Sequence, residues 1–74
     1  MPRLPILSGA RIIKTLRRMG YVPVRQRGSH VRLVHPKRPQ WPTTVPMYKT
    51  IDRSLLRIIL QEVHLSIEEF LEKL

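Results

Sequence analysis

Residues 21–47, YVPVRQRGSHVRLVHPKRPQWPTTVPM, decide the fold because they contain a two-residue hairpin loop between strand-like segments. Gly28 and Ser29 fit the loop positions of a type II′ turn, whose first residue needs a positive φ that glycine adopts without a steric penalty. A turn of this type fixes the register of the strands that it joins. The sequence therefore predicts that Arg27 pairs with His30.

The predicted register sorts the strand side chains onto two faces, because side chains alternate along a strand and paired residues share a face. One face is predicted to join the core, and it carries Val22, Val24, Gln26, Val31 and Leu33. The opposite face carries Arg25, Arg27, His30 and Arg32. Guanidinium groups bind phosphate, and an imidazole can give or take a proton near neutral pH. This second face therefore predicts chemistry on phosphates.

Helices are predicted at both ends of the chain. One should run over residues 9–19, with Ser8 as its cap and a glycine directly after it. In the last third, Ser54 or Asp52 can cap a second helix, and residues 66–69 form a capping box for a short third one. Four basic side chains of the first helix form either a solvated face or an RNA contact: Arg11, Lys14, Arg17 and Arg18.

Strands are predicted over residues 21–27, 30–35 and 43–47. Pro23 cannot donate a ladder hydrogen bond, so the first strand should lie at a sheet edge. Three prolines predict an extended loop without regular structure over residues 36–42. The order αβββαα then gives an α+β fold, in which helices cover one face of a three-stranded antiparallel sheet and leave the arginines and the histidine on the other.

The length of 74 residues predicts a single small domain over residues 1–74. A chain of this size buries only about 60% of its unfolded surface. The sequence has no cysteine, so it has neither a disulfide nor a thiolate ligand for zinc. Its apolar runs are far shorter than the roughly 20 residues that cross a bilayer. No leader sequence is visible, and we expect a soluble cytoplasmic protein.

The charge is strongly basic, with 14 Lys and Arg against 5 Asp and Glu, a formal net charge of +9. All the acidic residues come after residue 51. Such an excess favours nucleic acid, an anionic membrane or an acidic protein as partner. A membrane is the weakest of the three, because a helix on a membrane surface keeps its aromatic residues opposite its basic face. Here the only tryptophan, Trp41, lies in the predicted proline-rich loop.

Most catalytic centres are excluded by the residues that the chain lacks. It has no cysteine nucleophile, no pair of carboxylates in its basic two thirds and no glycine-rich phosphate loop, and its histidines lack the spacing of a zinc site. We therefore expect no metal and no cofactor. RNA brings its own nucleophile, the 2′-hydroxyl, which a histidine can activate while cations stabilise the phosphorane.

The other histidines and the aromatic rings have simpler predicted roles. His35 is expected to be a hydrogen-bonded residue at a strand end, and His64 a left-handed turn residue between two helices. Trp41 and Tyr48 could stack on bases, although packing in the small core is the more common use of an aromatic ring.

Five blocks of this sequence resemble, in order and spacing, the HicA family of toxin–antitoxin toxins. They cover nearly the whole chain: Ser8-Gly9 before an Ile/Leu helix, Leu16–Tyr21, Arg25–His30, Thr44–Met47, and Leu56–Leu60 with Ser66–Leu71. The resemblance implies a fold like that of double-stranded-RNA-binding domains. It also implies a ribonuclease that cleaves mRNA without a metal and is neutralised by an acidic HicB-like antitoxin. The family's essential histidine corresponds to His30.

This sequence departs from the family pattern at two positions. Tyr48 stands where HicA-like sequences often have a histidine, and Ser54-Leu55 stands where they often have Gly-Thr. If a second proton-transfer group is needed, it must be Tyr48, Lys49 or water.

We therefore expect His30 to act as general base or acid. The residues expected to hold RNA are Arg25, Arg27, Ser29, Arg32 and Lys49. A non-catalytic RNA-binding regulatory module and a basic structural protein of a ribonucleoprotein are the alternatives. Both need the arginines, and neither needs the imidazole.

Overall fold

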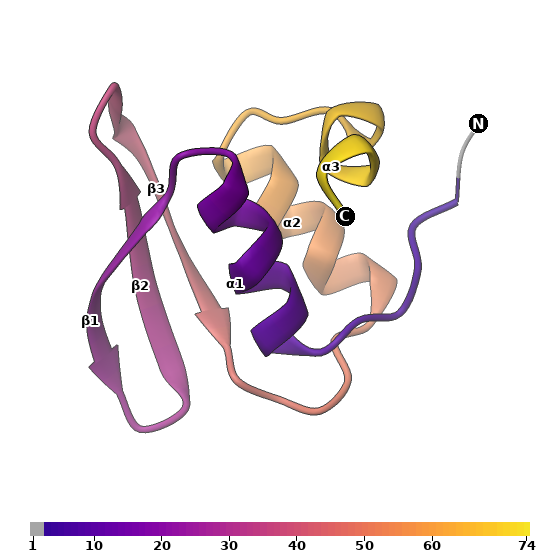
Figure 1. Ribbon diagram of the computed structural model, residues 1–74. Helices are drawn as coiled ribbons and strands as arrows, with labels where there is room; N and C mark the ends of the chain where they lie inside the picture. The colour runs from indigo at the N-terminus through magenta and orange to yellow at the C-terminus, as the bar shows by residue number, and fades with distance from the viewer. Residues whose placement is uncertain (1–2) are drawn as a thin grey trace.

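The structure, a computed structural model, describes residues 3–74 (Figure 1). Its elements follow the predicted order αβββαα. They are α1 (Gly9–Arg18), β1 (Val22–Arg27), β2 (His30–His35), β3 (Arg38–Pro46), α2 (Arg53–Glu62) and α3 (Ile67–Lys73). The strands form one antiparallel sheet in the order β1-β2-β3. The predicted α+β class and the position of β1 at a sheet edge are thus confirmed.

The hairpin between β1 and β2 has the predicted turn and register at its tip. Gly28 has a φ of 54°, and Ser29 does not have a positive φ, as a type II′ turn requires. Arg27 pairs with His30, and Arg25 pairs with Arg32. The glycine and the two-residue loop therefore fix the pairing of the residues that form the candidate site.

Further from the turn, the predicted register is wrong. Leu33 pairs with Pro23, where the turn alone predicted Val24, because an irregularity lies between Pro23 and Arg25. The extra residue is a bulge, which shifts every later pair on β1 by one position. Proline has no N–H for the ladder, so an interruption beside it loses few hydrogen bonds.

The predicted core face is also only half correct. Val31 and Leu33 of β2 are buried, whereas Val22 and Val24 of β1 are 44% and 56% exposed, and Gln26 is exposed too. The bulge explains Val22, because it now pairs with Val34, on the face opposite to that of Leu33. The placement of the helices explains Gln26, which still pairs with Val31. Helices α1 and α2 both contact β3, at the opposite edge of the sheet, and do not extend over β1 (Figure 1).

Strand β3 is longer than predicted and includes most of the segment that was expected to be an irregular loop. Pro39, Trp41 and Pro42 all lie within it. The prediction was wrong because β3 is an edge strand, where a residue without an N–H loses no ladder partner if that position faces away from the sheet. The pairing with β2 is irregular between Leu33 and His35, which accommodates the additional residues.

The helix boundaries follow side-chain caps. Ser8 Oγ accepts from the backbone N–H of Arg11 at the start of α1, and Ser66 forms the predicted capping box with Glu69 at the start of α3. The cap of α2 is Asp52, whose Oδ1 accepts from Leu55 N–H at 2.9 Å. Ser54, the other predicted candidate, lies inside the helix.

The core lies between the sheet and the helices and is completed by α3. Its largest buried side chains come from every layer: Phe70, Leu4, Ile12, Leu16, Leu33, Ile51, Leu56, Ile59, Val45 and Val63. Helix α3 packs against α1 and α2 on the side away from the sheet (Figure 1). No helix within residues 3–74 has the length and apolar character needed to cross a membrane.

Gly9 allows α1 to approach the end of β3 more closely than any other residue type would. A Cβ at this position would overlap Pro46 O and would lie 2.9 Å from Pro46 C and 3.0 Å from Met47 Cα. The backbone N–H of Gly9 donates to Tyr48 O at 2.9 Å. This contact fixes the chain directly after β3, which carries the residues beside His30.

Candidate active site

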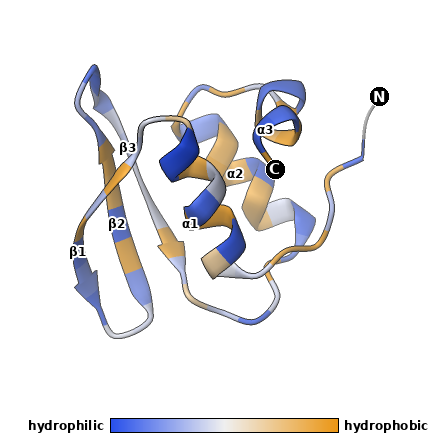
Figure 2. Ribbon diagram, in the orientation of Figure 1, coloured by the Kyte–Doolittle hydropathy of each residue, from blue (hydrophilic) through white to orange (hydrophobic). Residues whose placement is uncertain are grey.

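A pocket of about 390 Å³ opens on the face of the sheet that the helices leave uncovered. The side chains that line it come from all three strands: Arg25, Arg27, His30, Arg32 and Thr44. Four of the five are the residues that the hairpin register placed together. Figure 2 shows the hydrophilic character of β1 toward the hairpin, where two of these arginines lie.

Cross-strand pairing explains why these side chains converge. The pairs Arg27 with His30 and Arg25 with Arg32 put two side chains of each strand on one face. On the other side of β2, Arg32 pairs with Thr44, and His30 pairs with Pro46. Because β2 is the central strand, its histidine and arginine lie between the cations of β1 and the hydroxyl of β3.

Thr44 is the site residue that the sequence analysis missed. Its Oγ1 accepts a hydrogen bond from Arg32 Nη1 at 3.1 Å. This bond orients the guanidinium over the pocket and restricts the rotamers that a long arginine side chain would otherwise sample. A usable signal was present, because Thr44 alternates with Val45 along a strand and must face away from the core if Val45 faces it.

Tyr48 lies beside the predicted catalytic histidine. The centroids of the Tyr48 and His30 rings are 6.1 Å apart, and the rings meet edge to face at 81°. Tyr48 is 48% exposed, so it does not serve as a core residue. Its backbone is fixed by the hydrogen bond from Gly9 N–H, and the preceding residue, Met47, donates from its N–H to Ser29 O at 2.6 Å.

The other two predicted RNA contacts, Ser29 and Lys49, lie outside the lining of the pocket. Ser29 is in the turn next to His30, and its backbone carbonyl accepts a hydrogen bond from the Met47 N–H. Lys49 is exposed directly after Tyr48. Neither side chain lines the pocket itself.

The remaining histidines have structural partners. His35 Nδ1 accepts from Lys37 N–H and its Nε2 donates to Met19 O, both at 3.1 Å. Its predicted role as a hydrogen-bonded strand-end residue is confirmed. His64 has the expected left-handed conformation, with a φ of 55°. Its ring stacks on Trp41 with centroids 4.0 Å apart.

Tyr21, which directly precedes β1, contacts β3. Its side chain is buried, and its hydroxyl donates to Trp41 O at 3.0 Å. Burial raises the pKa of the Tyr21 hydroxyl, and the positive charge of Arg38 opposes part of that rise. The residue is therefore a neutral core element at physiological pH.

The arrangement in the pocket is suited to proton transfer at a phosphodiester. An exposed imidazole can take a proton from a hydroxyl or return one to a leaving oxygen. Three guanidiniums around it can bind the phosphate and stabilise additional negative charge in a phosphorane. The same three positive charges would repel a divalent cation. Within residues 3–74, no three side chains of the types His, Asp and Glu lie close enough to share a metal ion.

Comparison with known proteins identifies a family. The family model described as the HicA toxin of bacterial toxin–antitoxin systems matches residues 9–65, which extend from the start of α1 to just past α2. Comparisons with curated proteins and with solved structures give no significant match.

Proposed function

The chain belongs to the HicA family of bacterial toxins, and from that premise we propose that it is an endoribonuclease that cleaves mRNA without a metal ion and with His30 as its catalytic group. The observation that carries the proposal is the pocket in which His30 shares one surface with Arg25, Arg27 and Arg32. Such a constellation provides both proton transfer and charge neutralisation, the two requirements of RNA cleavage by its own 2′-hydroxyl.

In the proposed reaction, His30 takes the proton of the 2′-hydroxyl as that oxygen attacks the adjacent phosphorus. The arginines hold the non-bridging oxygens and stabilise the negative charge of the phosphorane. The bond from phosphorus to the 5′-oxygen then breaks, which leaves a 2′,3′-cyclic phosphate on one product and a 5′-hydroxyl on the other. The 5′-oxygen acquires a proton from a second donor, and His30 can serve in either the acidic or the basic role.

Two side chains are candidates for the second proton transfer. The Tyr48 ring lies next to His30, and Lys49 is exposed one residue later. The position of Tyr48 supports it as the nearer auxiliary group, either as a donor through its hydroxyl or as a ring that holds the imidazole in place. Water is the third source of a proton. Ser29 and Lys49 would contact the RNA backbone outside the pocket.

The family assignment implies an antitoxin partner. We propose that this antitoxin is an acidic HicB-like protein, because the chain has a net charge of +9 and an opposite charge accelerates association. The pocket around His30 is the natural site for inhibition, since a protein that covers it blocks both RNA binding and chemistry. The mRNA substrate would be met in the cytoplasm. The architecture that the resemblance implies, that of double-stranded-RNA-binding domains, is compatible with the αβββαα order.

A non-catalytic RNA-binding regulatory module is the alternative function, and product analysis distinguishes the two. Purified protein should cleave a synthetic RNA in the presence of EDTA and leave 2′,3′-cyclic phosphate or 3′-phosphate ends. An RNA that carries a 2′-deoxy substitution at the cleavage site is the matched control, and it should stay intact. Binding without cleavage would favour the regulatory module. Products with 5′-phosphate ends would contradict the metal-independent mechanism.

A further inference from the structure

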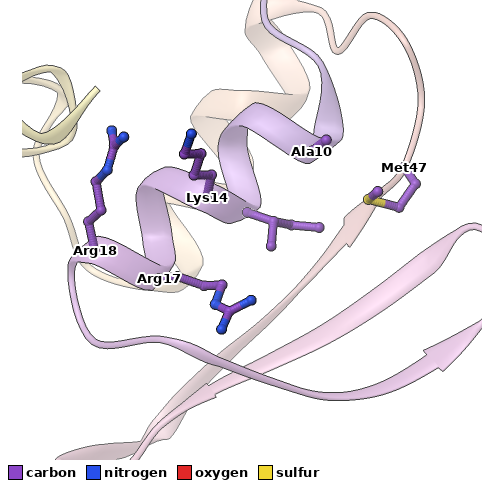
Figure 3. Close-up of a pocket in the computed structure, with 6 residues that line it drawn as sticks. Ala10, Lys14, Arg17, Arg18 and Met47 are labelled. Atoms are coloured by element: carbon purple, nitrogen blue, oxygen red, sulfur yellow. The ribbon is translucent and has the colours of Figure 1, made fainter.

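A second pocket, of about 470 Å³, lies on the helical side of the sheet, between the exposed flank of α1 and the residue that follows β3 (Figure 3). Its lining comprises Ala10, Ile13, Lys14, Arg17, Arg18 and Met47. Residues 10, 13, 14 and 17 form one continuous stripe, because side chains at i, i+3, i+4 and i+7 share a helix face. This stripe is distinct from the core-facing residues of α1, Ile12 and Leu16.

The floor of this pocket is apolar although it faces outward. Met47 is 43% exposed, Ile13 is half-buried, and Ala10 is exposed. In Figure 3, Met47 extends toward the end of α1 that carries Ala10. Apolar side chains at a solvent-facing pocket gain free energy when another apolar group covers them.

Two cations of this pocket are free to meet a ligand. Arg18 is already occupied, since its Nη1 donates to Lys73 O and Leu74 O at 2.9 and 3.0 Å. The side chains of Lys14 and Arg17 are exposed, and neither forms a hydrogen bond within residues 3–74. Figure 3 shows both projecting from α1 into the space around the pocket. The pocket therefore combines an apolar floor with a positively charged rim.

The pocket adjoins the candidate active site without including it. Met47, at one end, donates its N–H to Ser29 O, and the preceding Pro46 pairs with His30. The lining of the two pockets has no residue in common. A ligand seated here would contact the chain next to His30 and leave the arginines of the sheet uncovered.

We propose that this pocket binds an acidic segment of the antitoxin that carries an apolar anchor residue. The anchor would pack on Ile13 and Met47, and carboxylates beside it would pair with Lys14 and Arg17. A protein segment fits better than RNA, because a phosphodiester backbone satisfies the cations but gains little from the apolar floor. The inference rests on the family assignment, which implies an antitoxin, and it is independent of the proposed nuclease activity.

The test uses the full isotope-labelled chain and two short synthetic peptides of identical negative charge. One peptide carries two leucines between aspartates and glutamates, and the other has serines in place of the leucines. Titrations followed by amide chemical shifts locate the binding site and give the affinity. The expected result is that the leucine peptide shifts amides of residues 10–18 and Met47 and binds about fivefold more tightly than the serine peptide.

Variants then test the two parts of the pocket. Arg17→Glu should weaken binding of the leucine peptide about fivefold, whereas Arg57→Glu, an equal charge change on the exposed surface of α2, should have a much smaller effect. Met47→Ser should remove the preference for leucine over serine. RNA cleavage by the Arg17→Glu protein should match that by the Arg57→Glu protein.

Four results would overturn the proposal. They are shifts confined to the sheet around His30, equal affinity for the two peptides, equal effects of the two charge reversals, and a specific loss of RNA cleavage in Arg17→Glu. The last result would make the pocket an RNA-docking surface. The peptide titration reads binding alone, so a failure of the nuclease proposal would not change its outcome.

Discussion

Substituting Gly9 by alanine should destabilise the protein even though alanine is the better helix former. A Cβ at this position overlaps Pro46 O and comes within 3.0 Å of Met47 Cα. Both are backbone atoms, so no side-chain rotation can relieve the clash. The helix must shift, and the hydrogen bond from Gly9 N–H to Tyr48 O must lengthen or break.

The opposing contributions can be compared. Alanine gains up to about 1 kcal/mol of intrinsic helix propensity over glycine. Overpacking costs about 1–3 kcal/mol or more, and a lost hydrogen bond adds about 1 kcal/mol. Because the overlap is with backbone atoms, the overpacking cost falls in the upper part of this range, and the net destabilisation is about 2–3 kcal/mol. A small domain loses about 4–8 °C in melting temperature for each kcal/mol, so Gly9→Ala should melt about 10–20 °C lower than the parent chain.

Thermal and urea unfolding followed by circular dichroism measure this effect, and Gly28→Ala is the matched control. Gly28 has a φ of 54°, and a Cβ there would meet no atom within 4 Å. Its substitution should therefore cost only backbone strain, about 1–2 kcal/mol. If Gly9→Ala melted at the parental temperature, or if it lost less stability than Gly28→Ala, the close approach of α1 to β3 would be incorrect.

Three further predictions concern charge, titration and capping. Arg27→Glu should weaken binding of RNA and of the antitoxin together, with both effects reduced at high salt; an unchanged antitoxin affinity would place the inhibitor elsewhere. Burial raises the pKa of the Tyr21 hydroxyl above its ordinary value of 10.0, so this hydroxyl ionises at a lower pH in the unfolded chain than in the folded protein. The free energy of unfolding should therefore fall as the pH rises from 10.0 through the folded pKa. Tyr21→Phe should flatten this alkaline decline in urea unfolding, and an identical decline would refute the assignment. Asp52→Ala should cost about 0.5–2 kcal/mol and Ser54→Ala almost nothing, and the reverse order would contradict the observed cap.

The candidate site was predictable from sequence because it lies next to a tight turn. Gly28 limits the hairpin to one turn geometry, and pairing over the next few residues follows from it without knowledge of the rest of the fold. The side chains of His30 and Arg25 could thus be placed on one face. The alternation with Val45 indicates the face on which Thr44 lies, but not that Thr44 pairs with Arg32. That pairing depends on the register of β3, which is set by an irregular connection that no local sequence signal specifies.

Other parts of the fold depend on contacts between distant segments. The bulge at Val24 separates the register that the turn sets, in which Arg25 pairs with Arg32, from the register in which Pro23 pairs with Leu33. Only the assembled sheet determines this change of register. The exposure of β1 follows from this bulge, which moves Val22 to the open face, and from where the helices pack. The periodicity of a single strand indicates neither. Similarly, Pro39 and Pro42 are compatible with a strand only because β3 lies at a sheet edge.

The measurement that tests the account most directly is the rate of RNA cleavage by His30→Ala. The side chain is exposed, so the variant should keep the circular dichroism spectrum and melting temperature of the parent. Loss of a general acid–base group should slow cleavage by about 10²–10⁴-fold and abolish growth inhibition. A folded His30→Ala protein that cleaves RNA at the parental rate would contradict the assignment of His30 as the catalytic residue.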